Sequence, residues 1–310
     1  MRKLLTIIVP IKDSYKYTYS IIEQVTSMNS ELIDMVISDN SDDNSEMIQY
    51  IDNLGSSCIN YFHHDKPISM TENFEVGIKE ANGEYVCILG ADDNFSTKIL
   101  EVVQYLKDND IESAIFNKAA YNWPGMQFRV HHKTPNLTIK KFTGELKHID
   151  VSNEFNALLA RGMTSLGKLP APYHGVIRKE RFEEVLLKSG RYIPGASPDM
   201  AMAVSLSLVT SKHVFIDAPI TISGHSYNSA GGKGARGQHK GNLKNKSFLP
   251  ADIEERWPSF IPKVWTSPTV YADSLVSSLK KMKEEDKLKS FQEKFAALEG
   301  ALKKLKEIDG

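Results

Sequence analysis

Short runs of apolar, mostly β-branched residues alternate with longer mixed segments over residues 4–116. Such alternation is typical of strands and helices that follow one another in a parallel sheet. The apolar runs predict strands at residues 4–9, 34–38, 58–62, 85–89 and 113–116. Apolar residues at three- and four-residue spacing predict helices at residues 15–28, 71–81 and 97–107. We therefore expect one α/β unit here.

The pattern changes after residue 116. Residues 117–148 are rich in polar residues, with proline and glycine among them, which indicates an insertion of loops with room for a hairpin. Helical spacing returns from residue 151 to residue 161. Further helices are predicted at residues 179–188 and 199–208, and further strands at residues 173–177, 213–216 and 220–223.

Two unusual segments follow. Residues 218–251 contain no acidic residue but are rich in glycine and lysine, which predicts a flexible cationic loop. The last forty residues are helical and highly charged, and their apolar residues follow a heptad-like spacing: Leu288, Phe291, Phe295, Leu298, Leu302 and Leu305. We expect this tail to pack on the domain or to mediate self-association, with at most a peripheral contact to a membrane.

These changes predict a domain over residues 1–250 and a helical C-terminal extension over residues 251–310. The domain divides into a first half, residues 1–116, and a second half with the basic loop, residues 117–250.

Composition excludes several classes of function. The 38 basic and 39 acidic residues give a net charge of −1, which argues against a nucleic-acid partner. Cys58 and Cys87 have no cysteine or histidine at metal-ligand spacing, which argues against a zinc site. No apolar run is long enough to span a bilayer, and Pro10 interrupts the first one, so that we expect a cytoplasmic protein.

Acidic residues follow two of the predicted strands. Asp92 and Asp93 come directly after the strand at 85–89, and Asp39 ends the strand at 34–38. Ligands of open parallel sheets bind at the carboxyl ends of the strands. Adjacent carboxylates repel each other unless a cation neutralises them, and their oxygens suit Mg²⁺ or Mn²⁺. The simpler alternative is a pair of solvated turns, which also explains residues 41–45 well.

Together these features resemble family 2 glycosyltransferases, inverting enzymes of the GT-A fold that use nucleotide-sugars. The resemblance covers about residues 4–225. It rests on the opening strand that ends in Pro10, on Ser38-Asp39-Asn40-Ser41, on Asn73, on the block at residues 81–93 and on Pro198-Asp199. It implies an α/β GT-A domain with a mainly parallel central sheet.

The resemblance also implies roles for individual residues. The nucleotide-sugar would be bound by Pro10, Asp39, Asn73, Asp92, Lys233 and Arg236. A divalent cation, Mn²⁺ or Mg²⁺, would be held by Asp93 with Asp92 and His225. Asp199 would be the base that deprotonates the acceptor hydroxyl, since a helix N-terminus favours a charged carboxylate. Lys233 and Arg236 would neutralise the departing diphosphate.

Two positions depart from the pattern of that family. Gly90 stands where the family commonly has another aspartate, and Pro198 stands where it usually has a glutamate. The first departure leaves open which carboxylate contacts the metal.

The resemblance thus implies a glycosyltransferase that moves a sugar, most simply from a UDP-sugar, to a hydroxyl of a glycan or lipid-linked acceptor in bacterial surface polysaccharide synthesis. Residues 1–116 would then be the nucleotide-binding half of the domain and residues 117–250 its acceptor-side half. A catalytically silent GT-A scaffold is the alternative from another class. A nucleotidyltransferase is disfavoured because residues 10–14 form no glycine-rich phosphate loop.

Overall fold

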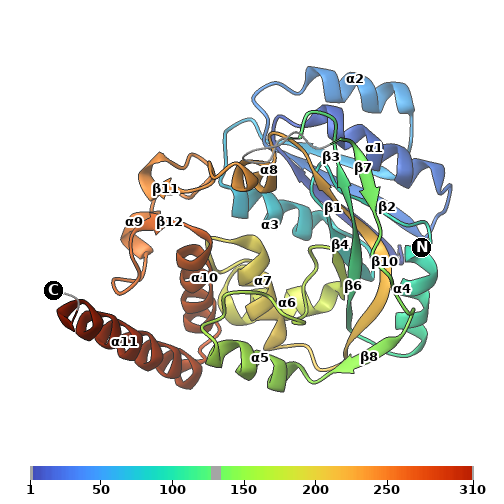
Figure 1. The fold of residues 1–310 in the computed structure, drawn as a ribbon. Helices are drawn as coiled ribbons and strands as arrows, with labels where there is room; N and C mark the ends of the chain where they lie inside the picture. The colour runs from blue at the N-terminus through green and yellow to red at the C-terminus, as the bar shows by residue number, and fades with distance from the viewer. Residues whose placement is uncertain (1–2, 127–133, 309–310) are drawn as a thin grey trace.

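The computed structural model describes residues 3–126 and 134–308, with side chains of the last helix described only up to residue 297. These residues form an α/β fold with helices on both faces of a central sheet (Figure 1). Strands and helices alternate through the first part of the chain: β1 (Leu5–Ile11), α1 (Tyr15–Ser27), β2 (Ile33–Asp39), α2 (Ser45–Leu54), β3 (Ile59–His63), α3 (Met70–Glu80), β4 (Tyr85–Ile88), β5 (Asn94–Phe95) and α4 (Ile99–Asp108).

The second part of the chain completes the sheet and adds helices. It contains β6 (Ser113–Asn122), β7 (Asn136–Thr138), β8 (Leu146–Ile149), α5 (Val151–Ala160), β9 (Gly175–Arg178), α6 (Lys179–Ser189), α7 (Pro198–Ser207) and β10 (His213–His225). Short elements and two helices follow: α8 (Ala230–Ala235), β11 (Gly241–Asn242), a 3₁₀ turn (Leu243–Asn245), α9 (Ile253–Arg256), β12 (Val264–Trp265), α10 (Ser267–Lys281) and α11 (Glu285–Ile308).

The sheet runs in the order β3-β2-β1-β4-β9-β6-β10-β5. β3, β2, β1 and β4 are parallel, and so are β6 and β10, which confirms the mainly parallel sheet. β9 runs antiparallel to both β4 and β6. The apolar run of β9 predicted a strand correctly, but a hydrophobic pattern does not reveal the direction in which a strand enters a sheet.

Alternate residues of β1 explain why both faces of the sheet are covered. Leu5, Ile7 and Val9 point to one face, where they pack with α1, α2 and α4. Ile8 points to the other, where it packs with α3, α6 and α7. Because successive side chains of a strand point to opposite faces, a strand covered on both sides must be apolar throughout. This accounts for the unbroken apolar run from which the strand was predicted.

A further apolar core joins the C-terminal helices to the rest of the chain. It combines residues of α5 and α7 with Trp257, Trp265 and residues of α10 and α11. Gly195 permits the close approach of α10, because a Cβ at this position would lie 2.7 Å from Cα of Ser274. Leu288, Phe291 and Phe295 pack into this core. The first half of the predicted heptad stripe therefore packs on the domain.

Several local features differ from the predictions. α2 was not predicted, although Met47, Tyr50, Ile51 and Leu54 recur at helical spacing and pack with the core. The two predicted strands after residue 212 form one long strand, β10, whose pairing is irregular around Pro219. The segment predicted as a flexible loop contains the end of β10 and several short ordered elements.

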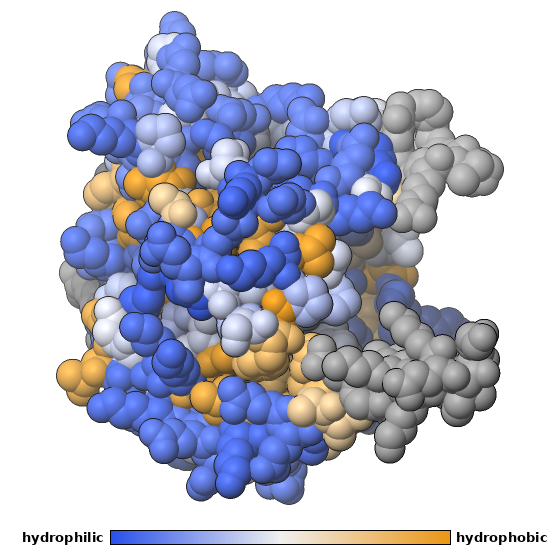
Figure 2. Space-filling model, turned by 90° about the vertical axis from the view of Figure 1, so that its left-hand side faces the viewer, coloured by the Kyte–Doolittle hydropathy of each residue, from blue (hydrophilic) through white to orange (hydrophobic). Residues whose placement is uncertain are grey.

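The surface carries mixed polarity. Hydrophilic side chains dominate the face that carries α11 and β11, with apolar side chains visible between them (Figure 2). Among residues 3–126 and 134–308, no helix combines the length and apolar character needed to cross a bilayer.

Candidate functional site

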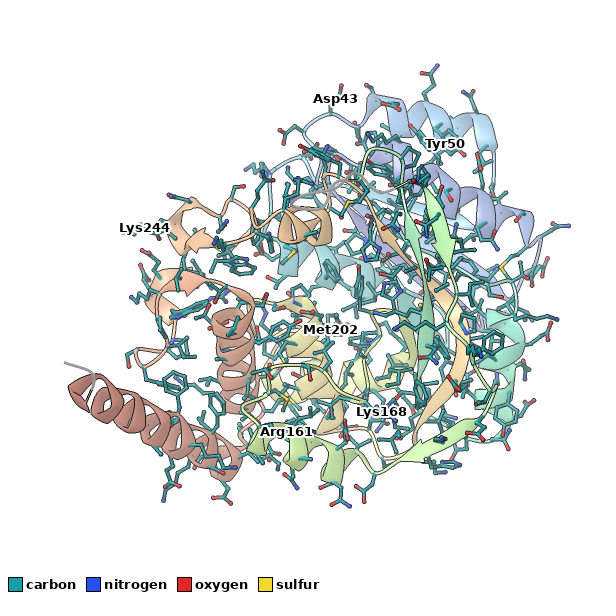
Figure 3. All side chains as sticks on the ribbon, in the orientation of Figure 1. Asp43, Tyr50, Arg161, Lys168, Met202 and Lys244 are labelled. Atoms are coloured by element: carbon teal, nitrogen blue, oxygen red, sulfur yellow. The ribbon has the colours of Figure 1, made fainter. Side chains whose placement is uncertain are left out.

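The predicted acidic residues gather at the carboxyl ends of the parallel strands. Asp39 pairs in register with Ile11 at the ends of β2 and β1, and Asp92 and Asp93 follow β4 on the other side of β1. Asp43, in the loop after β2, marks this end of the sheet at the top of Figure 3. The start of β9 and the end of β10 reach the same place, since His174 and Gly224 both contact Asp93.

Asp93 is enclosed by donors and is almost fully buried. Its Oδ2 lies 2.7 Å from the N–H of Gly90, 3.0 Å from the Tyr173 hydroxyl and 3.2 Å from Nε2 of His174. Its Oδ1 accepts a hydrogen bond of 2.8 Å from the N–H of Gly224. Burial opposes ionisation, but the charge and hydrogen bond of His174 and the two backbone N–H groups outweigh it and lower the pKa of Asp93. Asp93 therefore ties β4, β9 and β10 together as a carboxylate.

Asp92 is less enclosed than Asp93. Its Oδ2 accepts a hydrogen bond of 2.9 Å from the N–H of Ser226, and its backbone carbonyl accepts one of 2.8 Å from the indole of Trp123. Burial and then the negative charge of Asp93 raise the pKa of the Asp92 carboxyl. A cation beside Asp92 would stabilise the charged carboxylate and would therefore oppose both causes of the raised pKa.

His225 lies next to Ser226 at the end of β10, and its backbone carbonyl accepts a hydrogen bond from Trp123. Its Nδ1 is buried and finds no hydrogen-bond partner among the described residues. Nδ1 of His174, the histidine beside Asp93, is likewise buried and unpaired among these residues. Buried polar atoms are nearly always paired, so these two ring nitrogens are open to a group that binds from outside the chain.

These donors fit a divalent cation that is shared with a ligand. Within the described residues, no three His, Cys, Asp or Glu side chains form a complete cation site. Mg²⁺ usually takes one or two protein carboxylates and completes its shell with substrate phosphates and water. Asp92 and the unpaired nitrogen of His225 match such a partial donor set.

Two glycines fix the shape of this corner. A Cβ at Gly224 would lie 1.6 Å from the backbone oxygen of Asp92, so only glycine allows β10 to approach the acidic turn. A Cβ at Gly90 would lie 3.0 Å from both Oδ2 of Asp93 and the Tyr173 hydroxyl. An aspartate at position 90 would thus require these groups to move, which gives a physical reason for the glycine.

Asp199 lies in the first turn of α7, as the sequence predicted. Its Oδ1 accepts hydrogen bonds from the Ser197 hydroxyl and from the N–H of Met200, and its Oδ2 lies 3.1 Å from the Tyr271 hydroxyl of α10. α7 is otherwise buried, and Met202 marks it near the middle of Figure 3.

Lys118 and Tyr173 connect Asp199 electrostatically with the acidic turn. Burial lowers the pKa of Lys118, while the charges of Asp93 and Asp199 act in the opposite direction. The pKa of Tyr173 is raised by burial and then by the charges of Asp93, Asp92 and Asp199. Tyr173 thus lies within the influence of all three aspartates, and Lys118 within that of Asp93 and Asp199.

Asp39 is fully buried at the end of β2. Its Oδ2 accepts hydrogen bonds of 2.7 Å from Tyr15 and 2.6 Å from Tyr61, and its Oδ1 accepts one of 2.9 Å from the N–H of Ser41. Burial, followed by the interaction with Asp39, raises the pKa of Tyr61. Asp39 thus orients two tyrosines at this corner of the sheet.

Asn73 and Pro10 lie close to this corner. The amide of Asn73 donates to the carbonyl of Ile11 at 3.2 Å and accepts from the hydroxyl of Ser38 at 2.7 Å. Ser38 in turn pairs in register with Pro10. Asn73 therefore joins α3 to the ends of β1 and β2.

The predicted phosphate-binding residues of the basic loop lie on α8 and directly after it. Lys233 is exposed. The Arg236 guanidinium stacks 3.7 Å from the ring centre of Tyr227 and donates 2.6 Å to the carbonyl of that residue. Arg236 is thus held within the loop, whereas no hydrogen bond or ion pair of the Lys233 ammonium is found in the described part of the chain.

Several site residues were not predicted from the sequence: Tyr15, Tyr61, Lys118, Trp123, Tyr173, His174, Ser226 and Tyr271. Most of them reach the site through pairing between distant segments, which no local pattern reveals. The stretch at residues 170–175 did carry a signal, because prolines and a glycine flank Tyr173 and His174. His174 also has a positive φ of 62°, an uncommon conformation that is enriched at functional sites.

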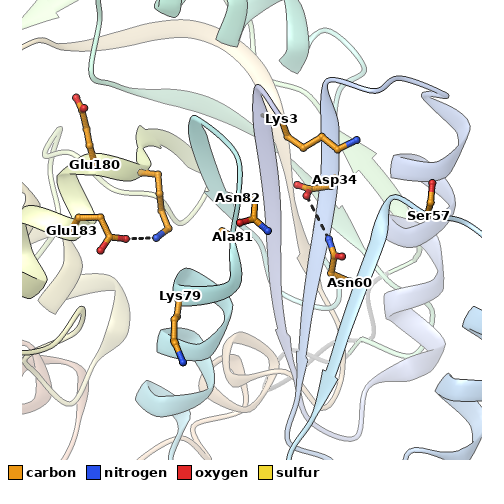
Figure 4. A pocket seen from close by; sticks show the side chains of 10 residues that line it. Lys3, Asp34, Ser57, Asn60, Lys79, Ala81, Asn82, Glu180 and Glu183 are labelled. Carbon is orange, nitrogen blue, oxygen red and sulfur yellow. Dashed lines mark hydrogen bonds and ion pairs between the residues drawn. The ribbon is translucent and has the colours of Figure 1, made fainter. Parts of the chain in front are cut away.

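A separate depression of about 720 Å³ lies at the opposite, amino ends of the strands (Figure 4). Its lining includes Lys3, Lys79 and Asp34, whose Oδ2 lies 3.4 Å from the amide of Asn60. The register of Asp34 with Thr6 places it near the start of β1, so that it is distinct from the acidic turns.

Comparison with known proteins agrees with this geometry. The family model described as "Glycosyl transferase family 2" matches residues 6–164. A curated relative, "Glycosyltransferase GlyG" of Streptococcus pneumoniae, is 23% identical over 219 residues, which are 70% of this chain and 69% of the relative.

Solved structures share the fold at low sequence identity. S. aureus TarS 1–349 in complex with UDP-GlcNAc has a TM-score of 0.53 at 12% identity, covering 73% of this chain and 59% of the other. GalNAc-T7 with UDP, GalNAc and Mn²⁺ has a TM-score of 0.52 at 15% identity, covering 73% and 44%. The chain thus spans less than two thirds of either protein. These likenesses confirm the GT-A fold.

Proposed function

The chain belongs to glycosyl transferase family 2, and we propose that it transfers a sugar from a UDP-sugar to a hydroxyl of a glycan or lipid-linked acceptor, with inversion and with the help of Mn²⁺ or Mg²⁺. The unpaired, buried Nδ1 of His225 beside the Asp92 turn carries this proposal. Of the solved structures compared above, one holds UDP-GlcNAc and the other holds UDP, GalNAc and Mn²⁺. The acceptor would belong to surface polysaccharide synthesis on the cytoplasmic side.

Asp92 and His225 would hold the cation. The alternative ligand Asp93 has both oxygens engaged by protein donors, so that the hydrogen bonds favour Asp92. When bound, the cation would act as a Lewis acid on the leaving diphosphate. Lys233 would add positive charge from the loop, and Lys118 from β6.

Asp199 would accept the proton of the acceptor hydroxyl. Its Oδ2 has one described partner, the Tyr271 hydroxyl at 3.1 Å, and keeps a lone pair for a second donor. The backbone N–H of Met200 and the N-terminus of α7 orient the other oxygen. Tyr173, whose hydroxyl donates to Asp93, has its pKa raised also by the charges of Asp92 and Asp199, and this shared neighbour supports the placing of the acceptor on the donor side of Asp199.

The nucleotide would lie over the ends of β1 and β2. Asp39 would act at this corner with Tyr15 and Tyr61, which it orients, and Asn73 would hold the backbone of Ile11 in place. Pro10, in register with Ser38, would form part of the same floor.

Calorimetry with UDP tests the proposal directly. We expect the wild-type protein to bind UDP in the presence of Mn²⁺ and much more weakly with a chelator. Asp92→Asn should weaken this binding roughly 100-fold. The loss of a metal ligand should reduce affinity more than the loss of a group that only orients a ligand does. Asp52→Asn, an exposed aspartate on α2, is the matched control and should bind as wild type.

A second variant separates binding from chemistry. Asp199→Asn should retain UDP affinity but lower transfer roughly 10²- to 10⁴-fold, the usual contribution of a general base. Screening the hydrolysis of several nucleotide-sugars would identify the donor. Absence of UDP binding by the wild-type protein would instead support a silent scaffold, and unchanged transfer by Asp199→Asn would exclude its role as base.

A further inference from the structure

An exposed apolar surface lies on β7 and the segment that follows it. Leu137, Ile139 and Phe142 are 52%, 53% and 53% exposed, and they fall within six consecutive residues. Leu137 and Ile139 are two residues apart, so that their side chains point to the same side of the extended chain. We call residues 136–143 the rim segment. Clustered apolar side chains of this kind mark interaction surfaces more often than scattered ones do.

The rim segment is also positively charged. Lys140 and Lys141 lie between the apolar residues and are exposed. No acidic residue occurs from residue 134 to residue 144, and no ion pair of either lysine is found among the described residues. The nearest following lysine, Lys147, is paired with Glu145 at 3.1 Å. Two lysines that are unpaired within the described part of the chain therefore accompany three exposed apolar side chains.

Hydrogen bonds anchor the rim segment at both ends. β7 pairs antiparallel with Ala120, Tyr121 and Asn122 of β6. At the other end, the N–H and hydroxyl of Thr143 both donate to Oδ2 of Asp217, at 2.9 and 2.7 Å. The apolar side chains are thus presented from a fixed backbone.

The rim segment is linked to the proposed cation site. Leu137 pairs in register with Tyr121, whose ring centre lies 5.3 Å from that of Trp123. The indole of Trp123 donates to the carbonyl of Asp92 at 2.8 Å. A surface bound at Leu137 would therefore lie close to the proposed cation site.

We propose that the rim segment docks on a bilayer that contains anionic lipid and holds the proposed cation site near the membrane surface, where a lipid-linked acceptor is delivered to the bound donor. The docking itself is independent of catalysis, while the delivery of the acceptor rests on the proposed function. Apolar side chains enter the interface and lysines contact anionic headgroups, which is the usual division of roles in peripheral binding.

A lipid surface fits the rim segment better than a second copy of the chain does. A symmetric pair would bring Lys140 and Lys141 of both copies close together, and like charges at such an interface oppose binding. β7 is only three residues long, which offers few backbone groups for edge-to-edge pairing.

Sedimentation with vesicles tests the proposal. The full chain should bind vesicles of phosphatidylcholine with phosphatidylglycerol and bind pure phosphatidylcholine much less. Lys140→Ala with Lys141→Ala should weaken binding roughly 30-fold, if each lysine contributes about 1 kcal/mol at an anionic surface. Leu137→Ser, Ile139→Ser and Phe142→Ser together should abolish it. Both variants should bind UDP as wild type does.

Matched controls lie elsewhere on the surface. Leu187→Ser removes a leucine that is 86% exposed on α6, and Lys289→Ala with Lys294→Ala removes two exposed lysines of α11. Both controls should bind vesicles as wild type does. The proposal is overturned if the wild-type protein ignores anionic vesicles, if the rim variants still bind them, or if sedimentation velocity shows a dimer that the rim variants lose. If the wild-type protein does not bind UDP, that result argues against the proposed function. It does not change the interpretation of the vesicle experiment.

Discussion

At the scale of single residues, the two adjacent aspartates have different surroundings. Asp93 accepts hydrogen bonds from three strands or their flanking turns and has a lowered pKa, whereas Asp92 keeps a less enclosed carboxylate with a raised pKa. The sequence located this pair, because strand ends are visible in the hydrophobic pattern. It did not separate the two roles, since His174, Gly224 and Ser226 approach from distant parts of the chain.

Gly224→Ala tests the close approach of β10 to the acidic turn. A Cβ there would overlap the backbone oxygen of Asp92, so that either the turn or the strand must move. We expect Mn²⁺-dependent UDP affinity to fall about tenfold or more, as with other losses of support to a metal ligand. Gly234→Ala on α8, where no atom lies within 4 Å of the new Cβ, is the control. Calorimetry that finds equal affinity for both variants would show that Gly224 does not shape the site.

At the scale of elements, the contact of α10 with α7 contains a buried aspartate. Asp273 is almost fully buried, with an Oδ2 that lies 3.2 Å from the N–H of Ala196. Burial raises its pKa to about 6 from the ordinary value of 3.8. The folded protein therefore binds the proton more tightly than the unfolded chain does, and stability attributable to this group falls as the pH rises from about 4 to 6.

Asp273→Asn should remove that pH dependence. Because two pKa units correspond to about 3 kcal/mol, the variant should gain up to about that free energy of unfolding at pH 7 relative to wild type and show little difference at pH 4. The amide oxygen of asparagine can still accept from Ala196. Urea unfolding at a series of pH values measures the free energy of unfolding of both proteins. The prediction is contradicted if this free energy rises between pH 4 and 6 in the wild type and stays constant in the variant.

Elements with strong local patterns were the ones that the sequence could predict. β1, β2, β4 and α7 are buried on every side, so that their apolar runs are continuous or nearly so. The direction of β9 and the continuity of β10 depend on pairing partners far away in the chain. The same holds for Lys118, which belongs to the site only because β6 lies between β9 and β10.

At the scale of the whole molecule, α7 connects two apolar cores. Met200, Ala203 and Val204 pack with the C-terminal helices, whereas Ala201, Met202 and Leu206 pack on the sheet. An element shared in this way couples the stability of the two regions. The helical extension, predicted from the sequence as a separate segment, is thus expected to unfold together with the sheet.

Phe291→Ala tests this coupling. Phe291 is 4% exposed in the C-terminal core, and its truncation should lower the free energy of unfolding by about 3 kcal/mol. Gln292→Ala, the exposed neighbour on α11, should leave it unchanged. Tryptophan fluorescence reports chiefly on Trp257 and Trp265 in that core, and far-ultraviolet circular dichroism reports on the whole chain. If α7 couples the two cores, both signals shift together in the variant; a fluorescence transition that separates from the circular dichroism transition would show that the C-terminal core unfolds independently.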